Sequence, residues 1–191
     1  MSKKGRILLT IPLVLVLGAF VFNIIGAAST YVGWFVSETK TTAFIVHFGW
    51  QGFTNEDLND EEFDYDDENF KTENMEGGGK AAGAFSILAM IWDLIGLVLL
   101  IVGIVFPGKV GVRKLCRTIA SMFIGMAAGS GFIAWLVFIA VFASEVNDEE
   151  TTIGFTTDTW TPSYAWFLGL FATLANFIAN CCVGGFGALD K

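Results

Sequence analysis

The chain has 191 residues, of which 54% are hydrophobic and only 16% are charged. A chain this apolar cannot cover its surface with polar side chains, so a typical soluble domain is excluded. The net charge of −8 also argues against nucleic acid as a partner, because binding to phosphates requires a basic surface.

Four apolar segments are each long enough to cross a bilayer, which takes about 20 helical residues. They are predicted at about 7–28, 81–106, 118–143 and 164–186, with Thr161 and Pro162 starting the last helix. The runs are continuous and not alternating, which predicts helices instead of barrel strands. A cleaved signal peptide is the alternative for the first segment, although its apolar run exceeds the usual length of about 7–15 residues. We therefore expect one membrane domain over residues 1–191, an all-α bundle of four transmembrane helices.

Basic residues predict which loops remain in the cytoplasm. Lys3, Lys4 and Arg6 precede the first segment, and four more bases lie in the loop 107–117. An even number of spans separates these two regions, so both fall on the same side. Both termini and the loop 107–117 are expected in the cytoplasm. The loops 29–80 and 144–163 are then extracellular, and the plasma membrane is the expected location.

The expected extracellular loops are strongly acidic. Residues 29–79 contain twelve acids and two bases, and nine of these acids fall within 54–70. Three interpretations remain open: a solvated linker extended by charge repulsion, a low-affinity cation site without EF-hand spacing, and a docking surface for a basic partner. Aromatic residues among the acids favour docking, because a spacer gains nothing by exposing rings. The candidate docking residues are Phe63, Asp64, Tyr65, Asp66, Asp67 and Phe70.

The first of these loops also contains strand signals. Residues 31–36 and 41–48 are rich in β-branched and aromatic residues and flank the polar "SETK", which predicts a hairpin. Two strands alone are marginally stable. Further strands are therefore expected around 63–70 and, from the loop 144–163, around 154–159.

The segments "VGWF" and "FGWQGF" in this loop, together with four spans and a smaller second loop, resemble the claudin superfamily. That group includes the peripheral myelin proteins, the calcium-channel gamma subunits and the amastins. The segment "FGWQ" also resembles the aromatic-Gly pattern of the amastins. Trp34, Gly49 and Trp50 match the claudin Trp and Gly-Leu-Trp pattern, without its Leu and without its two cysteines. The resemblance implies a small extracellular β-sheet that Trp34, Gly49 and Trp50 seat on the bundle.

Asp93 is the one charged residue near the middle of a predicted span. A charge at the bilayer centre costs about 2.5–3.5 kcal/mol on insertion scales, so such an acid usually faces protein or water. Its expected companions are Asn23, Asn176, Asn180, Ser130 and Thr173. A neutral acid hydrogen-bonded inside the bundle, a proton or ion pathway, and a contact with another chain remain as alternatives.

Two further patterns lie within or beside the spans. Ser121, Gly125 and Gly129 form a ridge of small residues at four-residue spacing, suited to helix packing within the bundle or to self-association. Cys116, Cys181 and Cys182 fall at the cytoplasmic ends of spans, where palmitoylation is an alternative to simple packing.

The expected function is binding and not catalysis. The sequence offers no Ser-His-Asp set, no phosphate-binding loop and no zinc spacing, so we expect no catalytic residue, metal site or cofactor. The expected partners are the lipid bilayer and other membrane proteins, in adhesion, barrier formation or membrane organisation. An auxiliary subunit of a channel, transporter or larger assembly, and an occludin-type MARVEL tetraspan, are the alternatives.

The predicted sidedness can be tested on intact cells. A protease added outside should cut between Thr54 and Glu76, while a tag after Lys191 should bind antibody only after permeabilisation. Protection of the acidic segment from the protease, or antibody binding to the tag on intact cells, would show that the orientation is the reverse of the predicted one.

Overall fold

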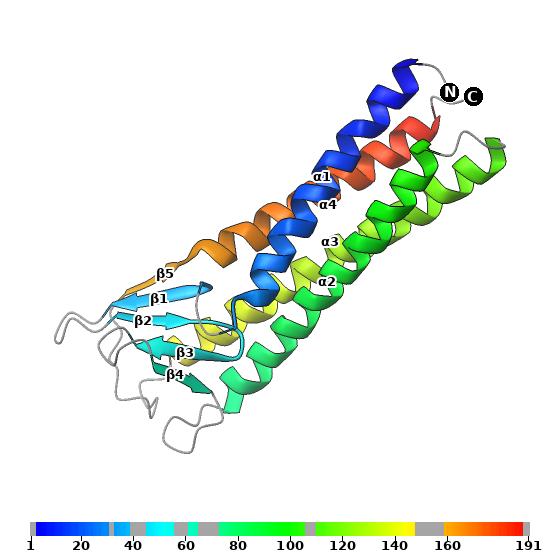
Figure 1. The fold of residues 1–191 in the computed structure, drawn as a ribbon. Helices are drawn as coiled ribbons and strands as arrows, with labels where there is room; N and C mark the ends of the chain where they lie inside the picture. Colours follow the sequence, from blue (N-terminus) through cyan, green and yellow to red (C-terminus); the bar gives the residue numbers. More distant parts are fainter. Residues whose placement is uncertain are drawn as a thin grey trace.

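The computed structural model of the protein is an elongated bundle of four long helices with a small β-sheet at one end (Figure 1). It describes residues 3–30, 33–38, 45–55, 61–64, 73–105, 110–147 and 159–188. The first helix begins and the last helix ends at the end of the bundle away from the sheet.

The helices are α1 (Lys3–Ala28), α2 (Glu73–Val105), α3 (Val110–Asn147) and α4 (Tyr164–Ala188). Within the described residues, four stretches are long and apolar enough to cross a membrane: Leu9–Ala28, Glu76–Val105, Gly111–Val141 and Tyr164–Gly185. A spanning chain must satisfy its backbone hydrogen bonds internally, which a helix does. The prediction of four apolar helices is confirmed.

α2 and α3 extend beyond the predicted spans 81–106 and 118–143. Their 33 and 38 residues give lengths of about 50 and 57 Å, more than a hydrocarbon layer of about 30 Å. The added part of α2 contains Gly78, although glycine disfavours helix. A Cβ at Gly78 would lie 2.1 Å from Cγ2 of Val141 in α3, so glycine permits the two helices to approach closely there.

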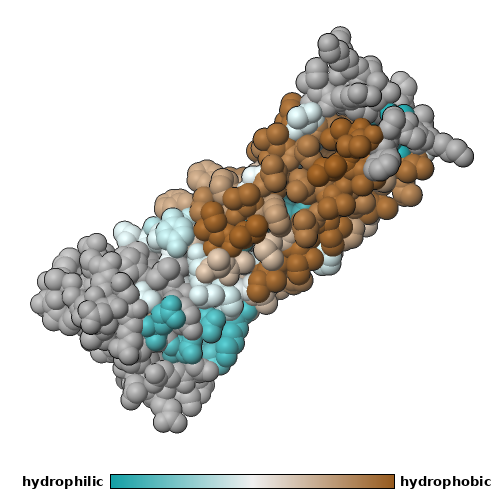
Figure 2. Space-filling view, viewed as in Figure 1, coloured by the Kyte–Doolittle hydropathy of each residue, from teal (hydrophilic) through white to brown (hydrophobic). Residues whose placement is uncertain are grey.

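The surface of the bundle is apolar, as Figure 2 shows along the helices. Large hydrophobic side chains point outward on every helix; Val14, Met122 and Phe177 are 62–63% exposed. Hydrophilic residues gather where the bundle meets the sheet. This apolar surface is what a lipid environment requires, since exposed hydrophobic area on this scale would cause a soluble protein to aggregate.

The interior of the bundle follows a seven-residue repeat of mostly small residues. On α2 the buried positions in this repeat are Gly79, Ala82, Ser86, Ala89, Asp93, Gly96, Leu100 and Gly103, and Gly83 is buried beside them. On α3 they include Ala120, Ile124, Ala127, Gly131, Ala134 and Phe138, and on α4 Ala165, Ala172, Asn176, Ala179 and Val183. Alternating steps of three and four residues keep one helix face toward its neighbours, and small residues there allow close backbone approach.

A buried apolar cluster lies toward the chain-terminal end of the bundle and draws on all four helices. Its members are Val16, Leu100, Ala120, Ile124, Ala179 and Val183. At Gly96 of α2 a Cβ would lie 2.9 Å from Cγ1 of Ile124, so this contact too depends on a missing side chain.

Within the described residues the sheet has five strands in the order β4-β3-β2-β1-β5, and all neighbours are antiparallel. The strands are β1 (Phe35–Glu38), β2 (Ile45–Phe48), β3 (Gly52–Asn55), β4 (Glu61–Asp64) and β5 (Thr159–Pro162). β1 and β2 overlap the two predicted strands, and β4 and β5 overlap the ends of the two further ones. β3 was not predicted.

The start of α4 differs from the prediction. Thr161 and Pro162 were expected to begin the helix, but they belong to β5, where they pair with Val36 and Phe35 of β1. Pro162 is the last residue of an edge strand, a position that tolerates the missing N–H. The helix begins two residues later, at Tyr164.

The ridge Ser121, Gly125 and Gly129 does not act as one surface. Ser121 Oγ donates a hydrogen bond to Asn180 Oδ1 of α4, and a Cβ at Gly125 would lie 3.1 Å from Asn180 Nδ2. Gly129 is exposed, with nothing within 4 Å of an added Cβ. Two members therefore pack within the bundle, and only Gly129 faces outward.

Leucine substitutions separate these two roles. Gly125→Leu should lower the free energy of unfolding by about 1–3 kcal/mol, because the side chain overpacks the contact with Asn180. Gly129→Leu should leave it within about 0.5 kcal/mol. Thermal unfolding in detergent measures both, and equal losses would contradict the assignment. A smaller dimer fraction for Gly129→Leu alone would indicate self-association through this position.

Candidate functional site

Trp50 joins the sheet to the C-terminal end of α1. Its indole Nε1 donates a hydrogen bond to the Ala27 carbonyl oxygen at 3.0 Å, and its backbone N–H donates to the Ser29 carbonyl oxygen at 3.3 Å. The backbone N–H of Gln51 donates to the Thr30 carbonyl oxygen at 2.7 Å. The last carbonyl groups of a helix have no partner within it, so these bonds satisfy groups that the junction would otherwise leave unpaired.

The Trp50 ring also packs directly on α2 at Gly83. A Cβ at Gly83 would lie 2.3 Å from Cε3 and 2.5 Å from Cδ2 of the indole, so only glycine permits this contact. Gly83 was not among the residues predicted from the sequence. An isolated glycine in a helical pattern can mark the close approach of another group, but it does not identify that group.

Trp34 fixes the sheet to α3. Its side chain is 2% exposed, and its ring centroid lies 4.6 Å from that of Phe138, with the planes tilted by 39°. Buried aromatic pairs of this kind contribute about 0.5–1.5 kcal/mol beyond their area. Trp34 therefore holds the start of β1 against the long helix that crosses beneath it.

Gly33 and Trp34 also accept hydrogen bonds from residues at the start of α4. The backbone N–H of Ala165 donates to the Gly33 carbonyl oxygen at 2.7 Å, and that of Ser163 donates to the Trp34 carbonyl oxygen at 2.9 Å. Gly33 has a φ of 102°, which favours glycine, and a Cβ there would lie 2.5 Å from Cζ of Tyr164. The role of Gly33 was likewise not predicted from the sequence, although Gly33 lies in the segment "VGWF".

Gly49 lies in the turn between β2 and β3. It is buried, and its N–H donates to the Gly52 carbonyl oxygen at 2.8 Å. Trp34, Gly49 and Trp50 thus all lie where the sheet meets the helix ends. Through Trp34 and Trp50 the sheet contacts three helices, and through Gly33 it reaches the fourth.

The strand β4 gives the sheet an acidic outer strand. It is the last strand in the order on that side, and the side chains of Glu62 and Asp64 are exposed. Residues two apart on a strand point to the same face, so these two carboxylates form one acidic patch. Gln51 Nε2 donates to Asp64 Oδ1 at 3.4 Å. Of the other docking candidates, the Phe63 side chain and residues 65–70, with Tyr65, Asp66, Asp67 and Phe70, lie outside the described part of the chain.

Asp93 lies inside the bundle and is 0% exposed. Asn23 of α1 donates from Nδ2 to Asp93 Oδ2 at 2.6 Å. Asn176 of α4, also 0% exposed, interacts with the same carboxyl, although neither of its amide atoms makes a hydrogen bond of good geometry. The carboxyl therefore meets polar groups from two other helices, as the neutral buried alternative requires, and it has no surface toward another chain.

Two of the other expected companions of Asp93 hydrogen-bond elsewhere. Asn180 accepts from Ser121, and the Thr173 hydroxyl donates to the Gly169 carbonyl oxygen at 3.0 Å. The sequence thus identified two of the polar neighbours correctly and could not rank them, because their depth and helix face depend on the packing.

The three cysteines are free and lie toward the bundle end away from the sheet. Cys181 is exposed, while Cys116 and Cys182 are half-buried. Exposure makes Cys181 the most accessible of them, and palmitoylation stays a prediction.

The described residues also include metal-ligating side chains. No three His, Cys, Asp or Glu residues among them gather where they could hold a metal ion. Comparison with models of known protein families and with curated proteins finds no match for the chain.

Alanine substitutions test the Trp50 contact. Gly83→Ala should lower the free energy of unfolding by about 1–3 kcal/mol, because its Cβ overlaps the indole. Gly77→Ala is the matched control in the same helix. Nothing lies within 4 Å of its added Cβ, so it should be neutral or slightly stabilising. Thermal unfolding in detergent should separate the two variants, and identical behaviour would mean that Trp50 does not pack as described.

Two substitutions test the structural role of Asp93. Asp93→Asn keeps an acceptor for the Asn23 amide and should cost less than about 1.5 kcal/mol. Asp93→Leu leaves the amide of Asn23 without its acceptor and should cost about 1–3 kcal/mol more. Unfolding in detergent measures both. Ion flux in liposomes that disappears in Asp93→Asn would instead support a transport pathway.

Proposed function

We propose that the protein is a plasma-membrane tetraspan of claudin-like architecture that mediates protein–protein contacts at the cell surface. In this proposal both termini are cytoplasmic and the sheet is extracellular. The contacts serve adhesion, barrier formation or membrane organisation. The basic residues in the first turn of α1, and those from Lys109 to Arg117 just before α3 and in its first turns, support this orientation, because such residues are retained in the cytoplasm.

The observation that carries the proposal is the attachment of the sheet to all four helices. Trp50 bonds to the end of α1 and packs on Gly83, Trp34 packs on Phe138, and Gly33 bonds to α4. A surface held at this many points keeps its shape, which lowers the entropic cost of binding a partner. A sheet that served only to connect spans would not need two tryptophans packed at its junction with the helices.

The acidic strand β4 indicates the chemistry of the partner. Two copies that met through β4 would place Glu62 and Asp64 opposite further carboxylates, which opposes self-pairing. A basic surface on a different protein would complement the patch. The acidic residues from 65 to 68 extend the same charge along the chain. This observation favours the second candidate function, an auxiliary subunit of a channel, transporter or larger membrane assembly.

Charge reversal tests the docking surface. Glu62→Lys with Asp64→Lys should reduce co-purification of the partner from native membranes in mild detergent by at least tenfold, since it replaces attraction by repulsion. Asp148→Lys with Glu149→Lys, in the second acidic segment, is the control of equal charge and should retain the partner. Equal retention by both variants would remove β4 from the interface.

The same purification distinguishes the candidate functions. A partner of defined stoichiometry indicates an auxiliary subunit. Self-polymers in the detergent extract, with aggregation of non-adherent cells that express the protein, indicate adhesion. A strictly monomeric protein that neither retains a partner nor aggregates cells would contradict both.

A further inference from the structure

Three buried polar atoms in the middle of the bundle lack a hydrogen-bond partner. They are Oδ1 of Asp93 and both amide atoms of Asn176, Oδ1 and Nδ2. The other carboxyl oxygen, Asp93 Oδ2, accepts a hydrogen bond from Asn23 Nδ2 at 2.6 Å. A polar atom without a partner is costly in an apolar interior, and lipid chains supply no partner. The proposed contact surface at the sheet does not account for these atoms.

The packing around the two side chains leaves no room for a molecular ligand. Asp93 and Asn176 are both 0% exposed, and the helix positions around them lie within the described part of the chain. Space for a water molecule beside these atoms would leave part of their surface exposed. An ordered water or a metal cation needs such space and several polar partners, whereas a proton needs neither. A proton is therefore the ligand that this arrangement can hold.

An ionised carboxylate is the alternative to a protonated acid. Both asparagine amides could then donate to the carboxylate, and as many polar atoms would be paired. Two neutral amides do not compensate a full charge away from water, however. A buried charge is tolerated where an opposite charge lies close to it. The choice between the two states therefore depends on the charged groups around Asp93.

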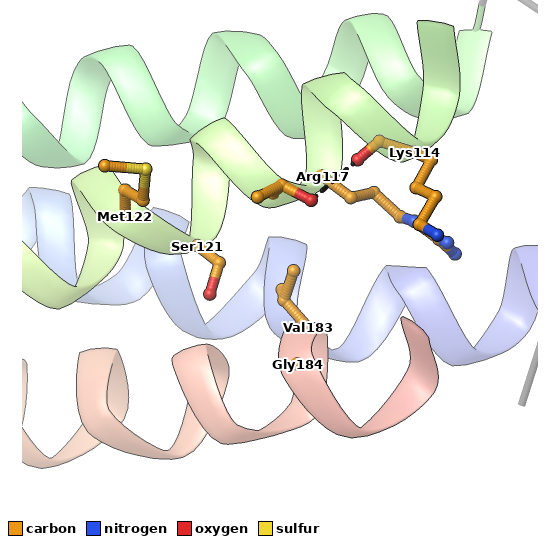
Figure 3. A pocket seen from close by; sticks show the side chains of 7 residues that line it. Lys114, Arg117, Ser121, Met122, Val183 and Gly184 are labelled. Carbon is orange, nitrogen blue, oxygen red and sulfur yellow. Dashed lines mark hydrogen bonds between the residues drawn. The ribbon is translucent and has the colours of Figure 1, made fainter. Parts of the chain in front are cut away.

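No basic residue of the described helices approaches Asp93. Gly96, one turn from Asp93 toward the chain-terminal end, packs against Ile124 of α3. Arg117 lies a further two helical turns, about 10 Å, in the same direction. In Figure 3 the side chains of Arg117 and Lys114 extend away from Met122, toward the start of α3 and thus away from Asp93.

The other titratable groups of the four spans lie nearer to the helix ends. The span Leu9–Ala28 of α1 contains none. Those of the other spans are Glu76 and Lys80 on α2, Arg113 and Cys116 on α3, and Tyr164, Cys181 and Cys182 on α4. The side chains that interact with the Asp93 carboxyl are Asn23 and Asn176, and both are neutral. The surroundings therefore favour the uncharged acid.

We propose that Asp93 is a proton-binding site, in which its Oδ1 carries the proton and donates it to Oδ1 of Asn176. Asn23 already occupies Oδ2, which leaves Oδ1 for the hydroxyl group. A half-turn of the Asn176 amide presents its oxygen without changing the shape of the side chain. The proton comes from water while the bundle assembles and returns to water when the helices separate. One proton thus holds α2 against α4, and this role is independent of the proposed contact function.

Infrared spectroscopy of the full chain in lipid vesicles tests the proposal at neutral pH, where exposed carboxyl groups are ionised. A protonated carboxyl has a C=O stretch that a carboxylate lacks. The wild-type spectrum should contain this band, and the Asp93→Asn spectrum should lack it. An asparagine at this position offers a donor and an acceptor in the same shape, so this variant should fold. Isotope-labelled aspartate would identify the band in the wild type by its shift, without any substitution.

Asn176→Leu tests the acceptor, because leucine has a similar volume and admits no water in place of the amide. The band should remain and move to higher frequency, since the carboxyl loses its hydrogen bond to Asn176. Asn180→Leu is the matched control on α4. Asn180 accepts from Ser121 and not from Asp93, so its substitution should leave the band in place.

A wild-type spectrum without the protonated band would show that Asp93 is ionised and would overturn the proposal. A band that Asn176→Leu does not move would exclude Asn176 as the acceptor. Equal shifts in the two leucine variants would indicate a general change in packing, and would also exclude the specific contact between Asp93 and Asn176.

Discussion

Close approach of the helix backbones is the constraint on which the rest of the structure depends. Lipid chains are as apolar as leucine, so burying large side chains between helices gains little from the hydrophobic effect, and packing must provide the attraction. α3 accordingly places Ala120, Ala127 and Ala134 toward its neighbours, and many of its large side chains, such as Met122 and Phe132, face outward. The same rule operates where the helices leave the membrane. Gly78 admits Val141 and Gly83 admits Trp50, so the sheet rests on helices that small residues have already brought together.

Asp93 occupies one of these interior positions, between Ala89 and Gly96 in the repeat of α2. Among small apolar neighbours its carboxyl is shielded from lipid, and its hydrogen bond from Asn23 links α2 to α1. Small residues permit helices to slide or rotate past one another at little cost. A polar group that has its partners in one arrangement alone disfavours the others, as a single polar residue does in coiled coils. The interaction of Asp93 with Asn23 and Asn176 thus specifies which faces of three helices meet.

The sequence predicted the features that follow from the lipid environment. It did not predict the features that depend on contacts between residues far apart in the chain. The four helices were predicted from hydropathy and bilayer thickness. Asn23 and Asn176 were predicted as neighbours of Asp93, because a buried carboxyl requires polar partners. The helical state of Gly77, Gly78 and Gly79 contradicts local propensity and holds because α3 packs alongside. The roles of Gly33 and Gly83 needed the positions of Tyr164 and Trp50, which no local pattern provides. The interior repeat is visible in the sequence as a pattern of side-chain size and not of polarity, so hydropathy alone does not reveal it.

The position of β1 has a consequence for biosynthesis. β1 pairs with β2 on one side and with β5 on the other, and β5 follows it by more than a hundred residues and two further crossings. During synthesis the β1 edge therefore remains open until the ribosome has made β5, which follows the third long helix. An open strand edge is a template for pairing with other chains. Nascent or truncated chains that end before Thr159 would carry this unpaired edge, by which chaperones could distinguish them from the finished protein.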